Sequence, residues 1–199
     1  MNQKHTTIAS TPHLELVERD GWTYVKRPTG RDVVAIIPLL GEGRNPSLIL
    51  IEQFRPPVGT RVIELPAGLR GDKRGEETIA EAAQRELMEE TGWRAGSLTY
   101  AGCGTASAGL TDELINFFVA RQLIRVGEGG GVPEENERLT VHTIPSQDLL
   151  GWLVQQQQER HVLVSANLFA GLALLLLAPP PFVPPSISPS SPSSPSRQP

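Results

Sequence analysis

Short stretches rich in apolar and β-branched residues recur along the chain, some alternating with polar residues, and glycine, asparagine or proline separates most of them. This pattern is typical of β-strands. It predicts strands over residues 14–19, 22–26, 33–40, 47–53, 61–65, 98–103, 114–120 and 139–144. Asp20-Gly21, between the first two, is a strong hairpin signal.

Three other stretches predict helices. Residues 78–91 contain no glycine or proline, and Gly92 follows at the position where helices commonly end. Two more helices are predicted over 146–158 and 161–178. Because strands outnumber helices and hairpin-type loops join most of them, we expect a mixed sheet with helices packed on it, in the α+β or α/β/α class.

Composition changes this picture mainly at the C-terminus. Residues 179–199 hold nine of the 18 prolines and seven serines. Such a segment has little to bury, so we predict a disordered tail. We expect a hairpin segment over 1–30 and one folded domain over 31–178. The apolar run 168–178 is well short of the roughly 20 residues that span a membrane, which favours a buried helix.

Charge and cysteine content exclude some classes of protein. The chain has 18 basic and 22 acidic residues, and this mild acidity argues against a duplex nucleic-acid partner. Its single cysteine, Cys103, excludes an internal disulfide and a cysteine-based zinc cluster. The first residues contain no apolar segment of the kind that signal peptides need. We therefore expect a cytoplasmic protein with a reduced thiol and no membrane partner.

Two glutamates share the apolar face of the helix predicted over 78–91. At about 100° per residue, Glu86 and Glu90 fall among Ile79, Ala83 and Leu87. Like charges one turn apart repel, and burial removes their hydration. A divalent cation would relieve both effects, and oxygen ligands favour Mg²⁺ or Mn²⁺. The alternative is that both carboxylates face solvent.

Arg85 lies on a different side of this helix in the same projection. We therefore do not expect it to neutralise the acid pair. Its expected partners are acids one turn away on the helix surface, Glu81 or Glu89.

The residues around this helix match a known pattern. Gly71 is followed after five residues by Glu77, and after seven more by the run 85–93, RELMEETGW. This resembles the Nudix box, G-x5-E-x7-R-E-U-x-E-E-x-G-U, where U is a bulky apolar residue and Trp93 is an unusual last member. The resemblance implies an α/β/α sandwich with a mixed sheet and a small N-terminal β-hairpin appendage. It also implies Mg²⁺-dependent hydrolysis of a nucleoside diphosphate linked to another group.

The resemblance also implies roles for the box residues. Glu86 and Glu90 would be metal ligands, with Glu89 close by. Arg85 and Glu77 would form a pair that holds the loop and the helix together. Mg²⁺, or Mn²⁺ in its place, would then bridge the pyrophosphate of the substrate.

Two segments before the box extend the resemblance to the ADP-sugar pyrophosphatases, including the ADP-ribose enzymes. They are Gln53-Phe54-Arg55-Pro56-Pro57 and Glu64-Leu65-Pro66-Ala67-Gly68-Leu69. By this resemblance the Ala67 carbonyl would be a metal ligand and Arg55 would contact the substrate phosphates, with Glu64 in the same substrate-binding set. The subfamily has a proline where this chain has Ala108.

Two further features follow from the resemblance to this subfamily. Trp22 and Arg27 stand where it has a base-stacking tryptophan and an arginine, although Trp22 could instead pack on its own sheet. The subfamily places the water-activating glutamate in a loop that here contains Glu135 and Glu137, although these could also belong to an ordinary solvated loop. A homodimer that exchanges its N-terminal appendage is expected.

The expected activity is hydrolysis of ADP-ribose or a related nucleoside diphosphate sugar to a nucleoside monophosphate and a sugar phosphate. One alternative is a Nudix hydrolase for GDP-mannose, a dinucleoside polyphosphate, coenzyme A or a damaged nucleotide. The other is a non-catalytic nucleotide-sensing domain. The presence of Glu86, Glu89 and Glu90 favours a catalyst.

Overall fold

The computed structural model describes residues 5–28, 30–71, 77–131 and 138–177, and its centre is a mixed sheet. Along this sheet the strand order is β11-β6-β5-β4-β9-β8, while β10 pairs with β5 and β7 with β4. Pairing is parallel for β4–β9 and β6–β11 and antiparallel for the other neighbours. The strands are β4 (Asp32–Leu40), β5 (Ser47–Arg55), β6 (Thr60–Glu64), β7 (Ala67–Leu69), β8 (Trp93–Gly104), β9 (Leu114–Arg125), β10 (Thr140–Pro145) and β11 (Leu163–Val164).

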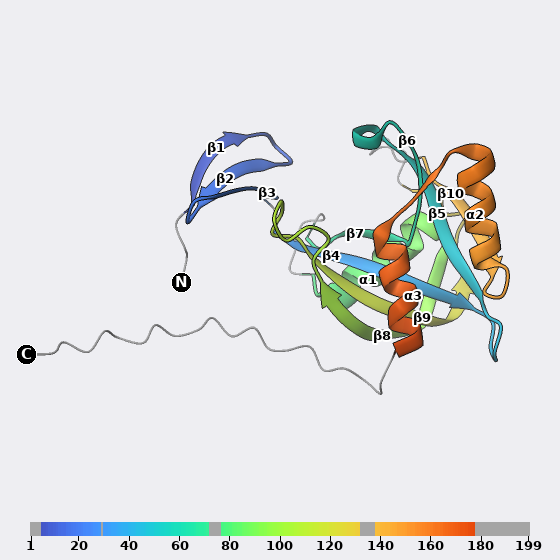
Figure 1. Cartoon of the computed structure of the whole chain (residues 1–199). Helices are drawn as coiled ribbons and strands as arrows, with labels where there is room; N and C mark the ends of the chain where they lie inside the picture. Colours follow the sequence, from blue (N-terminus) through green and yellow to red (C-terminus); the bar gives the residue numbers. More distant parts are fainter. Residues whose placement is uncertain (1–4, 29, 72–76, 132–137, 178–199) are drawn as a thin grey trace, which may run out of the picture.

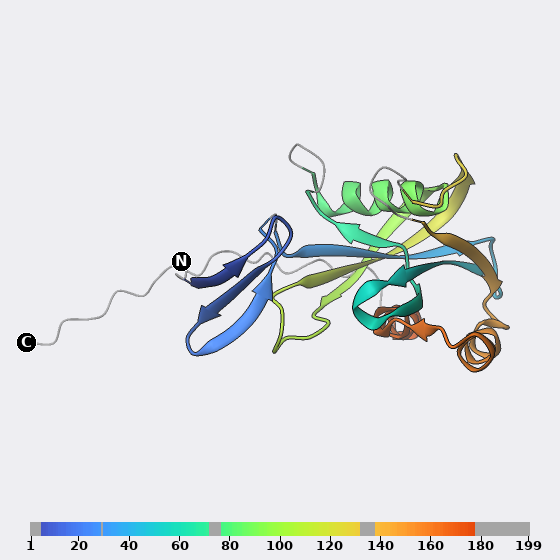
Figure 2. The ribbon, with the colours of Figure 1, turned by 90° about the horizontal axis from the view of Figure 1, so that it is seen from above.

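Helices cover both faces of this sheet. Figure 2 shows α1 (Ile79–Thr91) on one face and α2 (Leu149–Arg160) and α3 (Ala166–Leu177) on the other. Strand β4 explains the two cores, because its side chains alternate between faces. Val34 and Ile36 pack with the α1 side, while Ile37 and Leu39 belong to the α2 and α3 side. The predicted α/β/α sandwich is confirmed.

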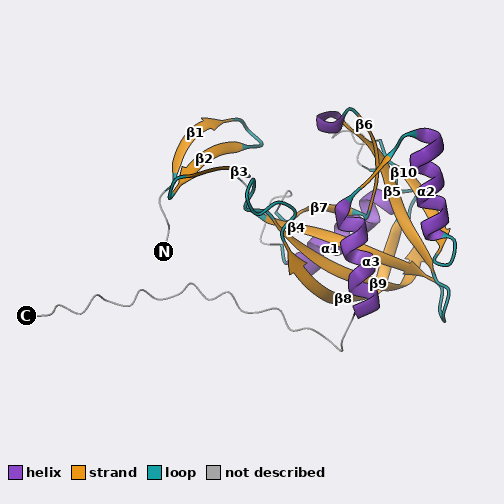
Figure 3. Ribbon diagram, viewed as in Figure 1, coloured by secondary structure: helices purple, strands orange, loops and turns teal. Residues whose placement is uncertain are grey.

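The predicted N-terminal hairpin is present, with one strand more than expected. Strands β2 (Glu15–Arg19) and β3 (Trp22–Lys26) flank the Asp20-Gly21 turn, whose φ angles are both positive. Strand β1 (Thr6–Ser10) pairs with β2, and all five of its residues are exposed. An apolar pattern could not predict β1 because it buries no face. The three strands project from the sandwich as a separate small sheet (Figures 1 and 3).

Other differences from the predicted elements have local causes. The last helix begins at Ala166 rather than near residue 161, because His161 has positive φ and β11 pairs with β6. The three-residue strand β7 is too short to show a period. A short 3-10 helix, Pro56–Val58, lies between β5 and β6. The predicted tail, 179–199, lies outside the described residues.

Two observations bear on the predicted environment of the chain. Within the described residues, no helix has both the length and the hydropathy needed to cross a bilayer. Cys103 is a free, exposed thiol.

A buried carboxylate joins four elements on the side of the sheet that carries α2. Glu52 of β5 is 1 % exposed and lies 2.5 Å from Nε of Arg61, 2.8 Å from Nη2 of Arg160 and 2.9 Å from Nε2 of His142. Burial alone would raise the pKa of Glu52. Hydrogen bonds from Arg160, Arg61 and His142 outweigh that effect and lower the pKa from 4.5 to about 2. Glu52 therefore stays ionised and holds β5, β6, β10 and α2 together.

Candidate active site

Helix α1 begins and ends at residues that fix its position. Thr78 accepts a hydrogen bond from the backbone N–H of Glu81, whose carboxylate accepts one from the Thr78 N–H in return. This capping box satisfies donors at the helix start. Gly92 ends the helix with φ +74°. The Glu81 carboxylate thus pairs with Thr78, which leaves Glu89 as the one of the two predicted partners that Arg85 contacts.

Both glutamates of the predicted acid pair lie on the buried face of α1. Glu86 is 8 % exposed and Glu90 is 3 % exposed. Leu87, Ala82 and Ala83 are buried on the same helix. The alternative that both glutamates face solvent is therefore wrong.

Arg85 reaches Glu86, one member of the acid pair, contrary to the expectation from the helix projection. Its Nη1 atom lies 2.7 Å from Oε1 of Glu86 and 3.2 Å from Oε2 of Glu89. A projection places Cβ atoms, whereas an arginine side chain is long enough to bring its guanidinium round to a neighbouring face. The pairing predicted with Glu89 is present.

The expected pair of Arg85 and Glu77 is also present. Nε and Nη2 of Arg85 lie 2.9 and 3.2 Å from the two Glu77 carboxylate oxygens, and Nη2 donates to the Leu69 carbonyl at 3.0 Å. The hydrogen bonds to Glu77 raise the pKa of Arg85 above its ordinary value. A permanently charged guanidinium thus joins the segment before α1, the strand β7 and the acid pair.

Strand β7 brings backbone against the two carboxylates. The Ala67 N–H donates to Oε2 of Glu90 at 2.9 Å. Gly68 approaches Glu86 so closely that a Cβ placed on it would overlap the carboxylate. The two acids therefore converge on the Ala67-Gly68 backbone.

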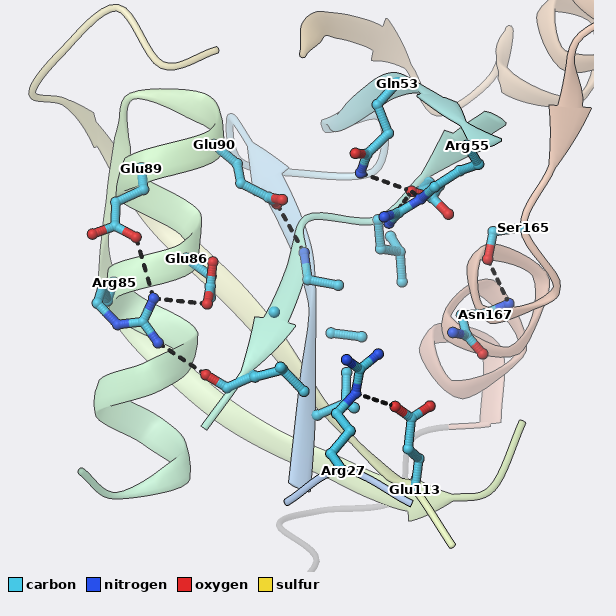
Figure 4. Close-up of a pocket in the computed structure, with 17 residues that line it drawn as sticks. Arg27, Gln53, Arg55, Arg85, Glu86, Glu89, Glu90, Glu113, Ser165 and Asn167 are labelled. Carbon is cyan, nitrogen blue, oxygen red and sulfur yellow. Dashed lines mark hydrogen bonds and ion pairs between the residues drawn. The ribbon is translucent and has the colours of Figure 1, made fainter. Parts of the chain in front are cut away.

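These groups line one side of a cavity of about 360 Å³. Figure 4 shows Arg85, Glu86, Glu89 and Glu90 projecting from α1, with Arg27, Gln53, Arg55, Glu113, Ser165 and Asn167 on the other elements around it. Eight residues predicted for the site line this cavity: Arg27, Arg55, Glu64, Ala67, Arg85, Glu86, Glu89 and Glu90.

Two ion pairs organise the side of the cavity away from α1. Arg55 approaches Oε2 of Glu64 with Nη2 at 2.7 Å and Nε at 3.0 Å, and Gln53 donates to the same oxygen at 3.0 Å. Nε of Arg27 lies 2.6 Å from Oε1 of Glu113. Each arginine is thereby held in one orientation at the cavity wall.

The other predicted site residues lie elsewhere. Trp22 is 66 % exposed and lines a second hollow of about 350 Å³ with Tyr24, Ala108 and Asp112. Glu135 and Glu137 lie outside the described residues.

Four polar residues that line the cavity were not assigned to the site from the sequence: Gln53, Glu113, Ser165 and Asn167. Gln53 lies in the same segment as Arg55, and Glu113 is a carboxylate in the turn before β9. Ser165 and Asn167, near the start of α3, carried no signal in the sequence.

The donor set fits a hard divalent cation in part. Glu86 and Glu90 are two buried carboxylates one turn apart, beside the backbone of Ala67. Oxygen donors of this kind suit Mg²⁺. Across the described ranges, no three His, Cys, Asp or Glu side chains form a ready-made metal cluster. Among the groups that the structure describes, the oxygens that could complete such a set beside the acid pair include the backbone of Ala67.

Residues 29–162 match the NUDIX domain. The chain belongs to the Nudix family. This Nudix protein is 35 % identical over 164 residues to the ADP-sugar pyrophosphatase of Mus musculus. The match covers 77 % of this chain and 73 % of that enzyme. It is 34 % identical over 126 residues to the ADP-ribose pyrophosphatase of Bacillus subtilis, and this match covers 63 % of each chain.

A solved structure, a crystal structure of ADP compounds hydrolase, matches the Nudix protein in fold. The TM-score is 0.65 at 24 % identity, over 87 % of this chain and 90 % of that chain. The predicted family and fold are both confirmed.

The close approach of Gly68 to Glu86 yields a test of the acid pair. Gly68→Ala should lower the affinity of the protein for Mn²⁺ by about 10- to 100-fold, because the flexible Glu86 carboxylate must move aside while the backbone stays. Titration calorimetry measures this affinity, and the melting temperature should change little. Gly104→Ala is the matched control, since a Cβ there meets no atom within 4 Å. Equal Mn²⁺ affinities in the two variants would contradict the expectation that Glu86 binds the metal.

Proposed function

We propose that this Nudix protein hydrolyses ADP-ribose or a related nucleoside diphosphate sugar to a nucleoside monophosphate and a sugar phosphate. One observation carries the proposal. A single cavity holds a buried acid pair on one side and two oriented arginines, Arg27 and Arg55, on the other. A pyrophosphate needs positive charge on its oxygens, and this cavity offers guanidinium groups and a place for a cation. The names of the mouse and Bacillus relatives support the choice of substrate class.

In this proposal the arginines bind and orient the substrate. Arg55, held by Glu64, contacts a phosphate oxygen through the guanidinium edge that Glu64 does not use. Arg27, held by Glu113, lies at the wall beside the other end of the substrate. Fixed orientation matters because an oriented guanidinium loses less freedom when the substrate binds.

At the acidic side, Glu86, Glu90 and the Ala67 carbonyl are the proposed metal ligands. Mg²⁺, with Mn²⁺ as a substitute, would neutralise phosphate charge and lower the pKa of the attacking water. Arg85 orients Glu86, and the Ala67 N–H orients Glu90. Glu89 lies beside them, and Glu135 or Glu137 is the proposed general base.

Three further expectations remain proposals. The exposed indole of Trp22 stacks on the nucleobase, a contact worth about 1–3 kcal/mol. A homodimer is supported by the small projecting sheet, which exposes Ile8, Leu14 and Trp22. A cytoplasmic location is supported only by the single free thiol of Cys103.

A substrate panel tests the proposed function. ADP-ribose, GDP-mannose, a dinucleoside polyphosphate, coenzyme A and an oxidised nucleoside triphosphate are each compared by kcat/KM with Mg²⁺. We expect the nucleoside diphosphate sugars to be cleaved best, and activity to vanish in excess chelator and return with Mg²⁺ or Mn²⁺. Cleavage of the triphosphate alone would contradict the substrate class, and full activity in chelator would contradict the metal role.

A further inference from the structure

A run of glycines lies directly against the end of α1. Residues 126–131 follow β9 and turn back across the last helical turn. Gly129, Gly130 and Gly131 have φ angles of +73°, +102° and +86°. We call these three residues the glycine clamp. Such a succession of positive φ angles is open to glycine and strained for other residues.

The clamp donates hydrogen bonds to carbonyl groups that a helix leaves without partners at its end. The Gly130 N–H donates to the Glu90 carbonyl at 2.8 Å, and the Gly131 N–H donates to the Glu89 carbonyl at 3.2 Å. The backbone of both acidic residues is therefore tied to a segment some 40 residues further along the chain.

Close packing of backbone on backbone reinforces these bonds. A Cβ on Gly129 would overlap the backbone of Thr91 and Gly92, and a Cβ on Gly92 would overlap the Gly127 carbonyl. Backbone atoms cannot swing aside as side chains can. Arg125 also holds the run, through Nε to the Gly127 carbonyl at 2.5 Å. The contact thus admits only glycine at its centre.

The position of the clamp matters because the last turn of a helix frays readily. That turn carries Glu90, whose carboxylate must stay against the Ala67 N–H. The Leu139 N–H donates to the Gly130 carbonyl at 3.1 Å, so the chain leaves the clamp after Gly131 and returns to it at residue 139.

We propose that the glycine clamp is a positioning element for the acid pair, an inference that rests on the metal site of the proposed function. It caps the Glu89 and Glu90 carbonyls, keeps the last turn of α1 helical and so keeps the Glu90 carboxylate at the metal position. It acts through Glu90 and touches no reacting atom.

Gly129→Ala in the full-length protein tests this role. The added Cβ should push the clamp off the helix end. We expect the Kd for Mn²⁺ to rise by about tenfold in titration calorimetry. We also expect faster hydrogen exchange of the Gly130 and Gly131 amides, measured by NMR. Gly43→Ala is the matched control, because Gly43 has φ +89° but open space around it. It carries similar backbone strain in the β4–β5 hairpin and should leave both readouts unchanged.

Three results would overturn the proposal: unchanged Mn²⁺ affinity in Gly129→Ala, unchanged amide exchange, or an equal loss of affinity in Gly43→Ala. If Gly129→Ala does not fold, Gly130→Ala and Gly131→Ala replace it. A Cβ added at Gly130 would lie 3.8 Å from the nearest atom. Gly130→Ala would therefore loosen the clamp through backbone strain at its positive φ angle and not through a steric clash. Each should then weaken Mn²⁺ binding more than Gly43→Ala does. Mn²⁺ binding is measured without substrate. Inactivity toward nucleotide sugars would therefore contradict the proposed function, whereas the Mn²⁺ affinities would still test the role of the clamp.

Discussion

Glu90→Gln should lower kcat with a nucleoside diphosphate sugar by more than about 100-fold, equivalent to about 2.7 kcal/mol of transition-state stabilisation. Glutamine keeps the volume of the side chain and can still accept the hydrogen bond from the Ala67 N–H. What it removes is the negative charge that a divalent cation needs. The helix should therefore remain in place while the proposed metal ligand is lost. Steady-state kinetics with Mg²⁺ gives kcat, and circular dichroism checks the fold.

Glu42→Gln provides the matched control for this experiment, because Glu42 is exposed in the hairpin between β4 and β5. It makes the same charge change at a residue that does not line the cavity, so it should keep wild-type kcat. A Glu90→Gln variant with unchanged kcat would contradict the proposed ligand. A third outcome would indicate the non-catalytic nucleotide-sensing domain instead. In that outcome the wild type shows no hydrolysis, and Glu90→Gln binds nucleotide as tightly as the wild type.

Glu52→Gln should lower the free energy of unfolding at pH 7 by about 3 kcal/mol, since it leaves three hydrogen-bonding partners without their shared carboxylate. The loss is smaller than for a wholly buried pair, because Arg61 and Arg160 are partly exposed and can be hydrated. Denaturation in urea measures the difference. Glu159→Gln on α2, where the carboxylate is exposed and bonded to Gln155, should change stability by less than about 0.5 kcal/mol.

The pH dependence of this difference follows from the lowered pKa of Glu52. A carboxyl whose folded-state pKa lies below its unfolded value contributes stability above the unfolded pKa and loses it as pH falls. With values of about 2 and 4.5, the advantage of the wild type over Glu52→Gln should be constant near neutral pH. It should shrink from about pH 5 downward and be nearly gone at pH 2. A difference that stays constant over this range would contradict the pKa assignment.

Most of the fold could be predicted from local patterns. The Asp20-Gly21 turn, the strands on either side of it and the helix that ends at Gly92 all carry short-range signals. Four short or exposed elements of the described chain were missed: β1 buries no face, and β7, β11 and the 3-10 helix Pro56–Val58 are too short to show a period. The start of α3 was misplaced because β11 forms by pairing with a distant strand, β6.

Residues that line the cavity could be predicted where one segment contains them. Burial of Glu86 and Glu90 followed from helical periodicity, and the resemblance of the two segments before the box supplied Arg55 and Ala67. The projection failed for Arg85, whose reach depends on side-chain length and on what surrounds it. Glu113 and Asn167 join the cavity from elements far apart in the sequence, so no spacing could indicate them.

The Nudix family, the α/β/α class and the two acids on one face of α1 could be read from the residues alone, because each depends on short-range patterns or on one motif. How the acids are held became clear from the folded chain. Gly68 lies against Glu86, Arg85 is held by Glu77 and by the Leu69 carbonyl, and the glycine clamp lies against the end of α1. Each of these is a contact between segments whose separation along the chain does not set their distance in space, so it is fixed by packing of the whole sandwich.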